Sequence, residues 1–393
     1  MSIQPWISVR HAALSELTLV ILTYNRPEMV QRLLRYLRSH ASEVALVLLD
    51  HGDVESQENN AAAIASLFPE VKHLRLPLET EWAEVLAKGV LEVKTRFSAF
   101  CPDDDIPVID GMIDAVSMLI VNQQMVCAQG YVLSLTETES AICFGPIEDY
   151  VPSYDGDTPL KRLFNMMRRY QPVFFAFYRT EVLEWVVNQI SAVKISNLNL
   201  MFQEFFYAAL VCTKGAIGRS ASISLWRRVT GSHTDRRTIH PYHQLIDNPG
   251  GLAADYLEFR EQLIPYYLDD AIPDFSAQEA GIRRVFDLVY LQFLVRHINY
   301  AELEAKICQL LEDPEHDYFS GLCAQESNFD SRNCAAVPEF QDSNVLIDIG
   351  VLKDAAQVTE ELLQGSVNVG REKKISTDML MDAVRLALDY RSA

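Results

Sequence analysis

The sequence predicts an α/β fold in which a mostly parallel, open sheet is flanked by helices. Strand-like and helix-like segments alternate over the first 125 residues. Two of the strand-like segments, residues 17–22 (LTLVIL) and 44–49 (VALVLL), are unbroken apolar runs, the pattern of parallel strands buried on both faces. Polar residues follow these runs directly. In open sheets of this kind, ligands bind beyond the carboxyl ends of the strands.

The alternation starts at residue 17. Pro27, shortly after the first strand, fits the first turn of a helix, and apolar residues at helical spacing follow it. The elements predicted in this half are strand 17–22, a helix from Pro27, strand 44–49, helix 57–67, strand 71–76, helix 82–93, strand 97–100 and helix 112–121.

The pattern changes after Met125, where two strands with the character of a hairpin come first. The elements predicted next are strands 125–135 and 141–144, loop 150–159, helix 160–170, strand 173–178, helices 181–191 and 198–212, and strand 221–229. From residue 252 the chain is mainly helical. Helices are expected over 252–268, 277–312 and 374–391, with a polar loop or linker over 323–347.

Composition limits the class of protein. The chain has 393 residues, of which 49% are hydrophobic, enough for a large core. Its net charge of -20 argues against a nucleic-acid partner, because a duplex binder needs a basic face. The excess of acidic residues is concentrated after residue 250, where the chain has 26 acidic and 12 basic residues.

The seven cysteines show no CxxC spacing, so neither a zinc site nor a disulfide framework is expected. The first ten residues carry no cleavage signature, and no segment approaches the roughly 20 apolar residues that span a membrane. We therefore expect a cytoplasmic protein, with peripheral attachment at the inner face of the membrane left open for a lipid-linked substrate.

Three consecutive aspartates, Asp103, Asp104 and Asp105, close the apolar strand 97–100. Like carboxylates repel one another, and each loses hydration where a strand end is enclosed. A divalent cation removes this penalty; oxygen ligands suit Mg²⁺ or Mn²⁺, which usually also hold substrate phosphates. The triad predicts an enzyme that handles a nucleotide diphosphate through a metal. The alternative is a solvated acidic loop in which Asp105 caps the next helix.

Three segments together resemble the family-two glycosyltransferases of the GT-A fold. Residues 19–27 (LVILTYNRP) resemble the family's opening strand and loop, and Asp50-His51-Gly52-Asp53 resembles its second-strand loop. Residues 103–105 have the position and form of its DxD motif. The resemblance covers residues 17–235. It implies a catalytic domain over 1–250, with a nucleotide-binding half (1–125) and an acceptor half (126–250), followed by an acidic, mainly helical region over 251–393.

The resemblance also implies a donor site. The nucleotide would be bound by Thr23, Tyr24, Asn25, Arg26, Asp50, Gly52, Asp53, Asp103 and Asp104. Mn²⁺ or Mg²⁺ would be held by Asp103, Asp105 and His233, with His240 and His243 as competitors for the histidine position. The candidates for contacts with the diphosphate or the acceptor are Arg227, Arg228 and Arg236.

An inverting transferase also needs a base that takes the proton of the acceptor hydroxyl. In the family this is an acidic residue at a helix start, and Glu204 is the best match. A lone carboxylate among Met and Phe residues should have a raised pKa, which suits a base. Phe205 stands where a second acid is common, so the identity of the base stays open. The alternative is that Glu204 is a helix N-terminal charge beside aromatic core residues.

The implied activity is the transfer of a single sugar, since transmembrane helices and the Gln/Arg-x-x-Arg-Trp element of processive synthases are absent from the sequence. A UDP-type donor is favoured, with a glycan, a lipid-linked sugar or a small molecule as acceptor. The alternatives are a sugar-nucleotide nucleotidyltransferase and a non-catalytic binding or assembly protein. An apolar face on residues 277–312 would either pack on the catalytic domain or form a homodimer; its members are Ile282, Val285, Leu288, Val289, Leu291, Phe293 and Leu294.

Overall fold

The computed structural model describes most of the first 297 residues and three later pieces. The described residues are 12–137, 141–144, 153–168, 170–193, 198–228, 245, 248–269, 274–297, 345–348, 360 and 377–392. Of the predicted site residues, His233 and Arg236 lie outside these ranges, as do the competing His240 and His243.

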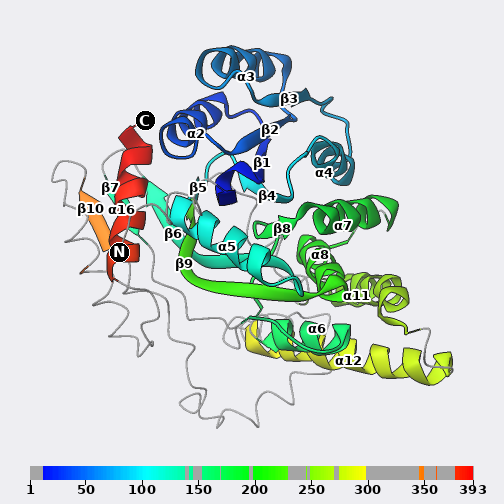
Figure 1. Cartoon of the computed structure of the whole chain (residues 1–393). Coiled ribbons are helices and arrows are strands. Elements are labelled where there is room, and N and C mark those ends of the chain that lie inside the picture. Colours follow the sequence, from blue (N-terminus) through cyan, green and yellow to red (C-terminus); the bar gives the residue numbers. More distant parts are fainter. Residues whose placement is uncertain are drawn as a thin grey trace, which may run out of the picture.

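One sheet of ten strands forms the centre of the molecule, and its main path runs β10-β7-β6-β8-β4-β1-β2-β3 (Figure 1). Strands β3, β2, β1 and β4 are parallel, and β6 is parallel to β9; the other pairs are antiparallel. The strands are β1 (Leu17–Thr23), β2 (Ala45–Asp50), β3 (Lys72–Arg75), β4 (Phe97–Pro102), β5 (Ile106–Pro107), β6 (Met125–Glu137), β7 (Ala141–Phe144), β8 (Phe177–Arg179), β9 (Ala216–Arg228) and β10 (Val345–Asp348).

Helices cover both faces of this sheet, so the predicted α/β class is confirmed (Figure 1). Strand β1 shows why its apolar run is unbroken: Leu19 and Ile21 enter one core, and Val20 enters the core on the opposite face. The helices are α2 (Pro27–His40), α3 (Val54–Leu67), α4 (Trp82–Leu91), α5 (Ile109–Val121), α6 (Pro159–Arg168), α7 (Thr180–Val193), α8 (Leu200–Lys214), α11 (Pro249–Leu263), η2 (Ile264–Tyr267, a 3-10 helix), α12 (Phe275–His297) and α16 (Thr377–Ser392).

Some predicted boundaries were wrong. The expected strand 173–178 is a strand only over 177–179, because the preceding apolar residues form a turn in which the Ala176 N–H donates to the Val173 carbonyl. The predicted loop 323–347 ends in strand β10, which pairs antiparallel with β7. The short strand β5 was not predicted at all. Two residues give no periodicity to read, and β5 exists only through its pairing with β9.

The C-terminal helix α16 packs on the first half of the chain, against α2 and β9 (Figure 1). Its buried residues share the core of β1 and α2; they are Leu380, Ala383, Val384, Ala387 and Tyr390. The Trp226 side chain, fully buried on β9, donates a hydrogen bond to the Ala383 carbonyl at 2.7 Å. The division of the chain at residue 250 stays a prediction, but α16 clearly shares its core with the N-terminal half.

Helix α12 lies beside α6 and buries part of its predicted apolar face (Figure 1). Ile282, Val289 and Phe293 are buried in the core on that side of the sheet. Leu288 and Leu291 point outward and are 57% and 58% exposed. The homodimer expected through this region stays a prediction. None of the helices in the described ranges combines the length and apolar composition needed to cross a membrane.

Candidate donor site at the carboxyl edge of the sheet

Three polar loops meet where parallel strands β1, β2 and β4 end. In the sheet register, Thr23 lies beside Asp50, and Leu22 lies beside Pro102. The loops that follow these strands therefore start as neighbours. They contain most of the residues predicted to bind the nucleotide and the metal, which confirms that the sequence segments 23–26, 50–53 and 103–105 converge on one edge.

The first two loops are held together by Asn25. Its backbone is left-handed, with φ 53°, and among the described residues it is the one non-glycine with positive φ. Its side-chain oxygen accepts a hydrogen bond from the Asp53 N–H at 2.7 Å. Gly52 lies so close that a Cβ there would stand 2.8 Å from this oxygen. Only glycine lets the loops approach this far.

Asp53 begins helix α3, earlier than the predicted start at residue 57. Its carboxylate accepts a hydrogen bond from the Ser56 N–H at 2.8 Å, the usual arrangement of a helix N-cap. This backbone hydrogen bond lowers the pKa of Asp53. In the structure, Asp53 therefore caps helix α3 at the edge of the site.

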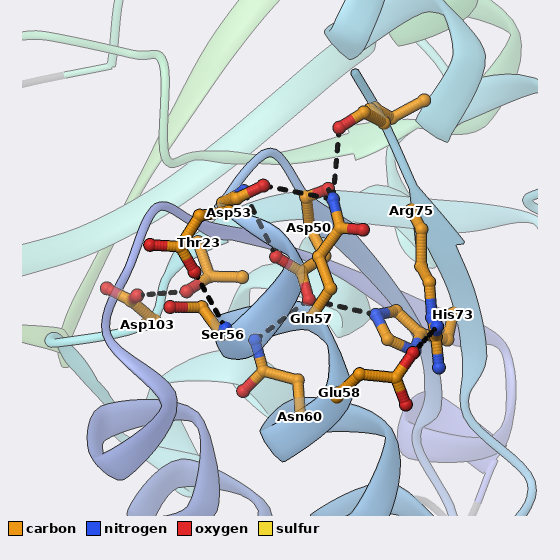
Figure 2. A network of polar contacts seen from close by, with 12 residues as sticks. Thr23, Asp50, Asp53, Ser56, Gln57, Glu58, Asn60, His73, Arg75 and Asp103 are labelled. Atoms are coloured by element: carbon orange, nitrogen blue, oxygen red, sulfur yellow. Dashed lines mark hydrogen bonds and ion pairs between the residues drawn. The ribbon is translucent and has the colours of Figure 1, made fainter. Parts of the chain in front are cut away.

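Asp50 is fully buried at the end of β2, inside a network of polar side chains (Figure 2). One carboxylate oxygen accepts from Asn60 at 2.9 Å and lies 3.0 Å from Nε2 of His73. The other accepts from the Gly52 N–H at 3.2 Å. A carboxylate has about four lone-pair positions, so Asp50 keeps the capacity for a further donor.

Gln57 ties the same region together from helix α3 (Figure 2). Its side-chain amide donates to the carbonyls of Asp50, Gly52 and Leu76 at 3.1–3.2 Å. Gln57, Asn60 and His73 were not predicted from the sequence. The signal available was that Gln57 and Asn60 are three apart on the helix that follows the Asp50 loop, and so share a face.

The three aspartates after β4 are almost completely enclosed: Asp103 is 0% exposed, and Asp104 and Asp105 are each 3% exposed. Asp103 accepts a hydrogen bond from the Thr23 hydroxyl at 2.6 Å (Figure 2). Asp105 accepts one from the Arg228 N–H at 2.9 Å. The triad is therefore not a solvated acidic loop.

Arg26 supplies positive charge to this loop. One of its guanidinium nitrogens lies 2.7 Å from Oδ1 of Asp103, and the other lies 2.6 Å from Oδ2 of Asp104. Burial nevertheless raises the pKa of Asp103 to about 7, although the charge of Arg26 and the Thr23 hydrogen bond lower it. Burial raises the pKa of Asp105 to about 7 as well, and the neighbouring Asp104 adds to the rise. The charge of Arg26 therefore does not offset the effect of burial on the Asp103 carboxyl.

The donor set fits a hard divalent cation, because three carboxylates with reduced hydration lie on one short loop. Asp103 and Asp105 are the residues that would hold it. In the described part of the chain, no three His, Cys, Asp or Glu side chains are already arranged as a metal cluster. The carboxylates are instead turned toward Thr23, Arg26 and the backbone of Arg228.

Two predicted basic residues end strand β9 with different exposure. Arg228 is buried, and its backbone N–H is bonded to Asp105. Arg227 is exposed, and its charge lowers the pKa of both Asp105 and Glu204. Of the two, Arg227 is thus the one placed to act electrostatically on the aspartate loop and on the candidate base.

Glu204 lies on helix α8, next to aromatic side chains. The Tyr170 hydroxyl donates a hydrogen bond to its Oε1 at 2.8 Å, and Phe205 packs edge-on against the Tyr170 ring at 4.7 Å. Burial raises the pKa of Glu204, while the Tyr170 hydrogen bond and the charge of Arg227 lower it. The predicted direction of this pKa is confirmed. Phe205, where a second acid is common, is a buried core residue.

Tyr24 is 56% exposed at the rim of the first loop. Its ring meets the His51 ring edge-on, with centroids 6.2 Å apart. The outer face of an exposed tyrosine ring can stack on a flat ligand such as a nucleotide base.

No family model matches the chain, and no curated protein matches it either. Similar solved structures include TarS 1–349 of S. aureus, at 13% identity and a TM-score of 0.44, covering 72% of this chain and 73% of that one. TarS 1–349 in complex with UDP-GlcNAc is similar at 12% identity and a TM-score of 0.37, covering 71% and 88%.

The mannosyltransferase PcManGT from Pyrobaculum calidifontis, in complex with GDP-Man and Mn²⁺, is similar at 11% identity and a TM-score of 0.38, covering 79% of this chain and 84% of that one. These identities and TM-scores are too low to carry a function from one protein to the other.

Proposed function

We propose that this protein is a metal-dependent glycosyltransferase. It would move a single sugar from a nucleotide-diphosphate donor, favoured as UDP-type, to a glycan, lipid-linked or small-molecule acceptor, with inversion. The observation that carries the proposal is the enclosed aspartate loop 103–105, at the carboxyl edge of a parallel sheet beside the loops of Thr23 and Asp50. Carboxylates enclosed by protein are stabilised by a bound cation, and a divalent cation usually accompanies a diphosphate ligand.

The first two loops would bind the nucleoside. Asp50 is held by Asn60 and His73, and a donor on the base would take one of its remaining lone-pair positions. The exposed ring of Tyr24 would stack on the base. Thr23, Asn25, Gly52 and Asp53 would shape the pocket wall rather than contact the sugar.

Asp103 and Asp105 would hold Mn²⁺ or Mg²⁺, with His233 proposed as a further ligand. When bound, the cation supplies Lewis-acid stabilisation of the diphosphate leaving group. Among the chain's own groups, Arg227 is exposed and close enough to both Asp105 and Glu204 to change their pKa values. We assign it to the diphosphate or to the acceptor, together with Arg236.

Glu204 would take the proton from the acceptor hydroxyl. Its raised pKa makes it a stronger base than an ordinary carboxylate, and the Tyr170 hydroxyl fixes one of its oxygens. The second oxygen would accept the proton. Because Phe205 is part of the core, no neighbouring acid on the helix competes for this role.

Calorimetric titration with UDP, GDP, CDP and TDP, each with and without Mn²⁺, tests the donor site. We expect one nucleotide to bind only in the presence of Mn²⁺, and we expect Asp105→Ala to abolish that binding. Arg385→Ala, an exposed change on α16, serves as the control. If none of the four nucleotides binds with Mn²⁺, the proposal fails and the non-catalytic scaffold takes its place. A nucleotidyltransferase would instead be identified by preferential binding of nucleoside triphosphates.

A further inference from the structure

Arg26 already occupies the position of a counter-ion in the aspartate loop. Its two terminal nitrogens contact carboxylates of consecutive residues, Asp103 at 2.7 Å and Asp104 at 2.6 Å. Both carboxylates are enclosed by protein. A guanidinium keeps its charge at any ordinary pH and offers a planar fork of donors, which matches the two carboxylates that Arg26 contacts.

The loop before helix α2 is shaped to deliver this side chain. Asn25 is left-handed, is anchored by the Asp53 N–H, and is followed directly by Arg26. Pro27 then begins the helix, and Arg26 stands at its N-cap position without making a side-chain cap hydrogen bond. The guanidinium therefore does not cap helix α2, and its described polar contacts are with the carboxylates of Asp103 and Asp104.

A divalent cation held by Asp103 and Asp105 would compete with Arg26 for the Asp103 carboxylate, which both would contact. Two cations within a few ångströms of each other repel, and each would lose part of the carboxylate charge to the other. The Arg26 side chain is 32% exposed, so its head can turn toward the ligand side without disturbing the core. A diphosphate offers the paired oxygens that a guanidinium binds in a bidentate manner.

We propose that Arg26 and a divalent cation are alternative counter-ions of Asp103, and that cation binding transfers Arg26 from Asp103 and Asp104 to the diphosphate of the donor. The inference rests on the proposed donor site and adds to it a coupling between its two ligands. Without nucleotide, Arg26 weakens cation binding. With nucleotide, Arg26 has a second anion to bind, and the cation enters the loop more readily.

The test is the affinity for Mn²⁺, measured by calorimetry and by electron paramagnetic resonance of the free ion. Wild type is compared with Arg26→Ala and with Arg26→Gln, which keeps most of the side-chain length. The matched control is Arg38→Ala, which removes the same charge from the far end of α2, where Arg38 lies 3.9 Å from Glu70 on the surface. Circular dichroism establishes that each variant is folded.

Without nucleotide, we expect both Arg26 variants to bind Mn²⁺ at least about tenfold more tightly than wild type, a difference of about 1.4 kcal/mol. Arg38→Ala should match wild type. Adding the nucleoside diphosphate that binds best should tighten Mn²⁺ binding strongly in wild type and much less in the Arg26 variants, because only wild type has an arginine to release.

Unchanged or weaker Mn²⁺ binding in both Arg26 variants overturns the exchange, even if wild type binds Mn²⁺ with nucleotide and the donor site itself stands. Absence of Mn²⁺ binding in every protein, with each nucleoside diphosphate present, removes the donor site and the exchange together. The two failures are thus distinguishable in one set of titrations.

Discussion

Tyr390 joins the C-terminal helix α16 to the aspartate loop. Its side chain is 1% exposed, and its ring packs edge-on against Tyr36 with centroids 5.6 Å apart. Its hydroxyl lies 3.4 Å from the carbonyl of Asp103, and Arg32 lies over the ring at 5.6 Å. Tyr36 in turn donates to the Pro107 carbonyl at 2.8 Å. Tyr390 therefore contacts the start of the aspartate loop, and Tyr36 contacts the strand that follows it.

Tyr390→Ala should lower the free energy of unfolding by about 3–5 kcal/mol, the range for removing a fully buried aromatic ring. Tyr390→Phe removes only a long hydrogen bond and should cost less than about 1 kcal/mol. Arg385→Ala, an exposed position on the same helix with an i,i+3 ion pair, should change stability by less than about 0.5 kcal/mol. Urea denaturation followed by circular dichroism measures all three.

A cost of less than about 1 kcal/mol for Tyr390→Ala would show that α16 is not docked as described. A second readout separates the helix from the site. Tyr390→Ala should also weaken Mn²⁺-dependent nucleotide binding, since the backbone of Asp103 loses its support, whereas Arg385→Ala should bind as wild type does.

Three further predictions concern the site itself. The pKa of Asp105 is about 7 in the folded protein against an ordinary 3.8, so this carboxyl should make metal-free wild type lose stability as the pH rises from about 4 to about 7. Asp105→Asn should remove the Asp105 share of this loss, although the share of Asp103 remains, and should exceed wild type at pH 8 by on the order of 4 kcal/mol in urea denaturation. Equal stability at pH 8 would contradict the burial of the Asp105 charge. Glu204→Gln should reduce transfer at least about a hundredfold while leaving calorimetric donor binding intact, and unchanged turnover would remove Glu204 as the base. Gly52→Ala should force its loop away from Asn25 and destabilise the fold by about 1–3 kcal/mol, whereas Gly281→Ala, whose Cβ meets no atom within 4 Å, should not; equal thermal stability of the two variants would speak against the close approach.

The parallel half of the sheet was predictable because its signals are local. The run 17–22 is apolar on both faces since both faces are covered, and Pro27 marks the start of the helix that covers one of them. The convergence of residues 23–26, 50–53 and 103–105 followed from the same fact, because parallel strands bring their carboxyl ends to one edge.

The partners of the site residues were not predictable, because they depend on register and on side-chain direction. His73 reaches Asp50 only because β3 pairs with β2 in the register that puts His73 beside Leu48. Arg26 was expected to line the nucleotide pocket, and nothing in the sequence signals that it bridges Asp103 and Asp104. That contact depends on the left-handed turn at Asn25.

The C-terminal part was the least predictable, since its contacts join segments far apart in the chain. Trp226 meets Ala383 across 157 positions, and Tyr390 meets Asp103 across 287. No local periodicity encodes such pairs. Strand β10 was likewise not predicted, because it lies in a polar stretch of sequence. It forms a strand by pairing with the edge of β7.

In the proposed function, the enclosed aspartate loop and Glu204 together transfer a sugar from a nucleotide donor. The most direct test is to incubate the full chain with Mn²⁺ and a panel of UDP-, GDP-, CDP- and TDP-sugars, with an equimolar mixture of simple glycosides as acceptor, and to measure the nucleoside diphosphate released. We expect release from one donor class by wild type and none by Asp105→Ala, with Arg385→Ala unaffected. Absence of release from every donor, or equal release by Asp105→Ala, would contradict the proposed function.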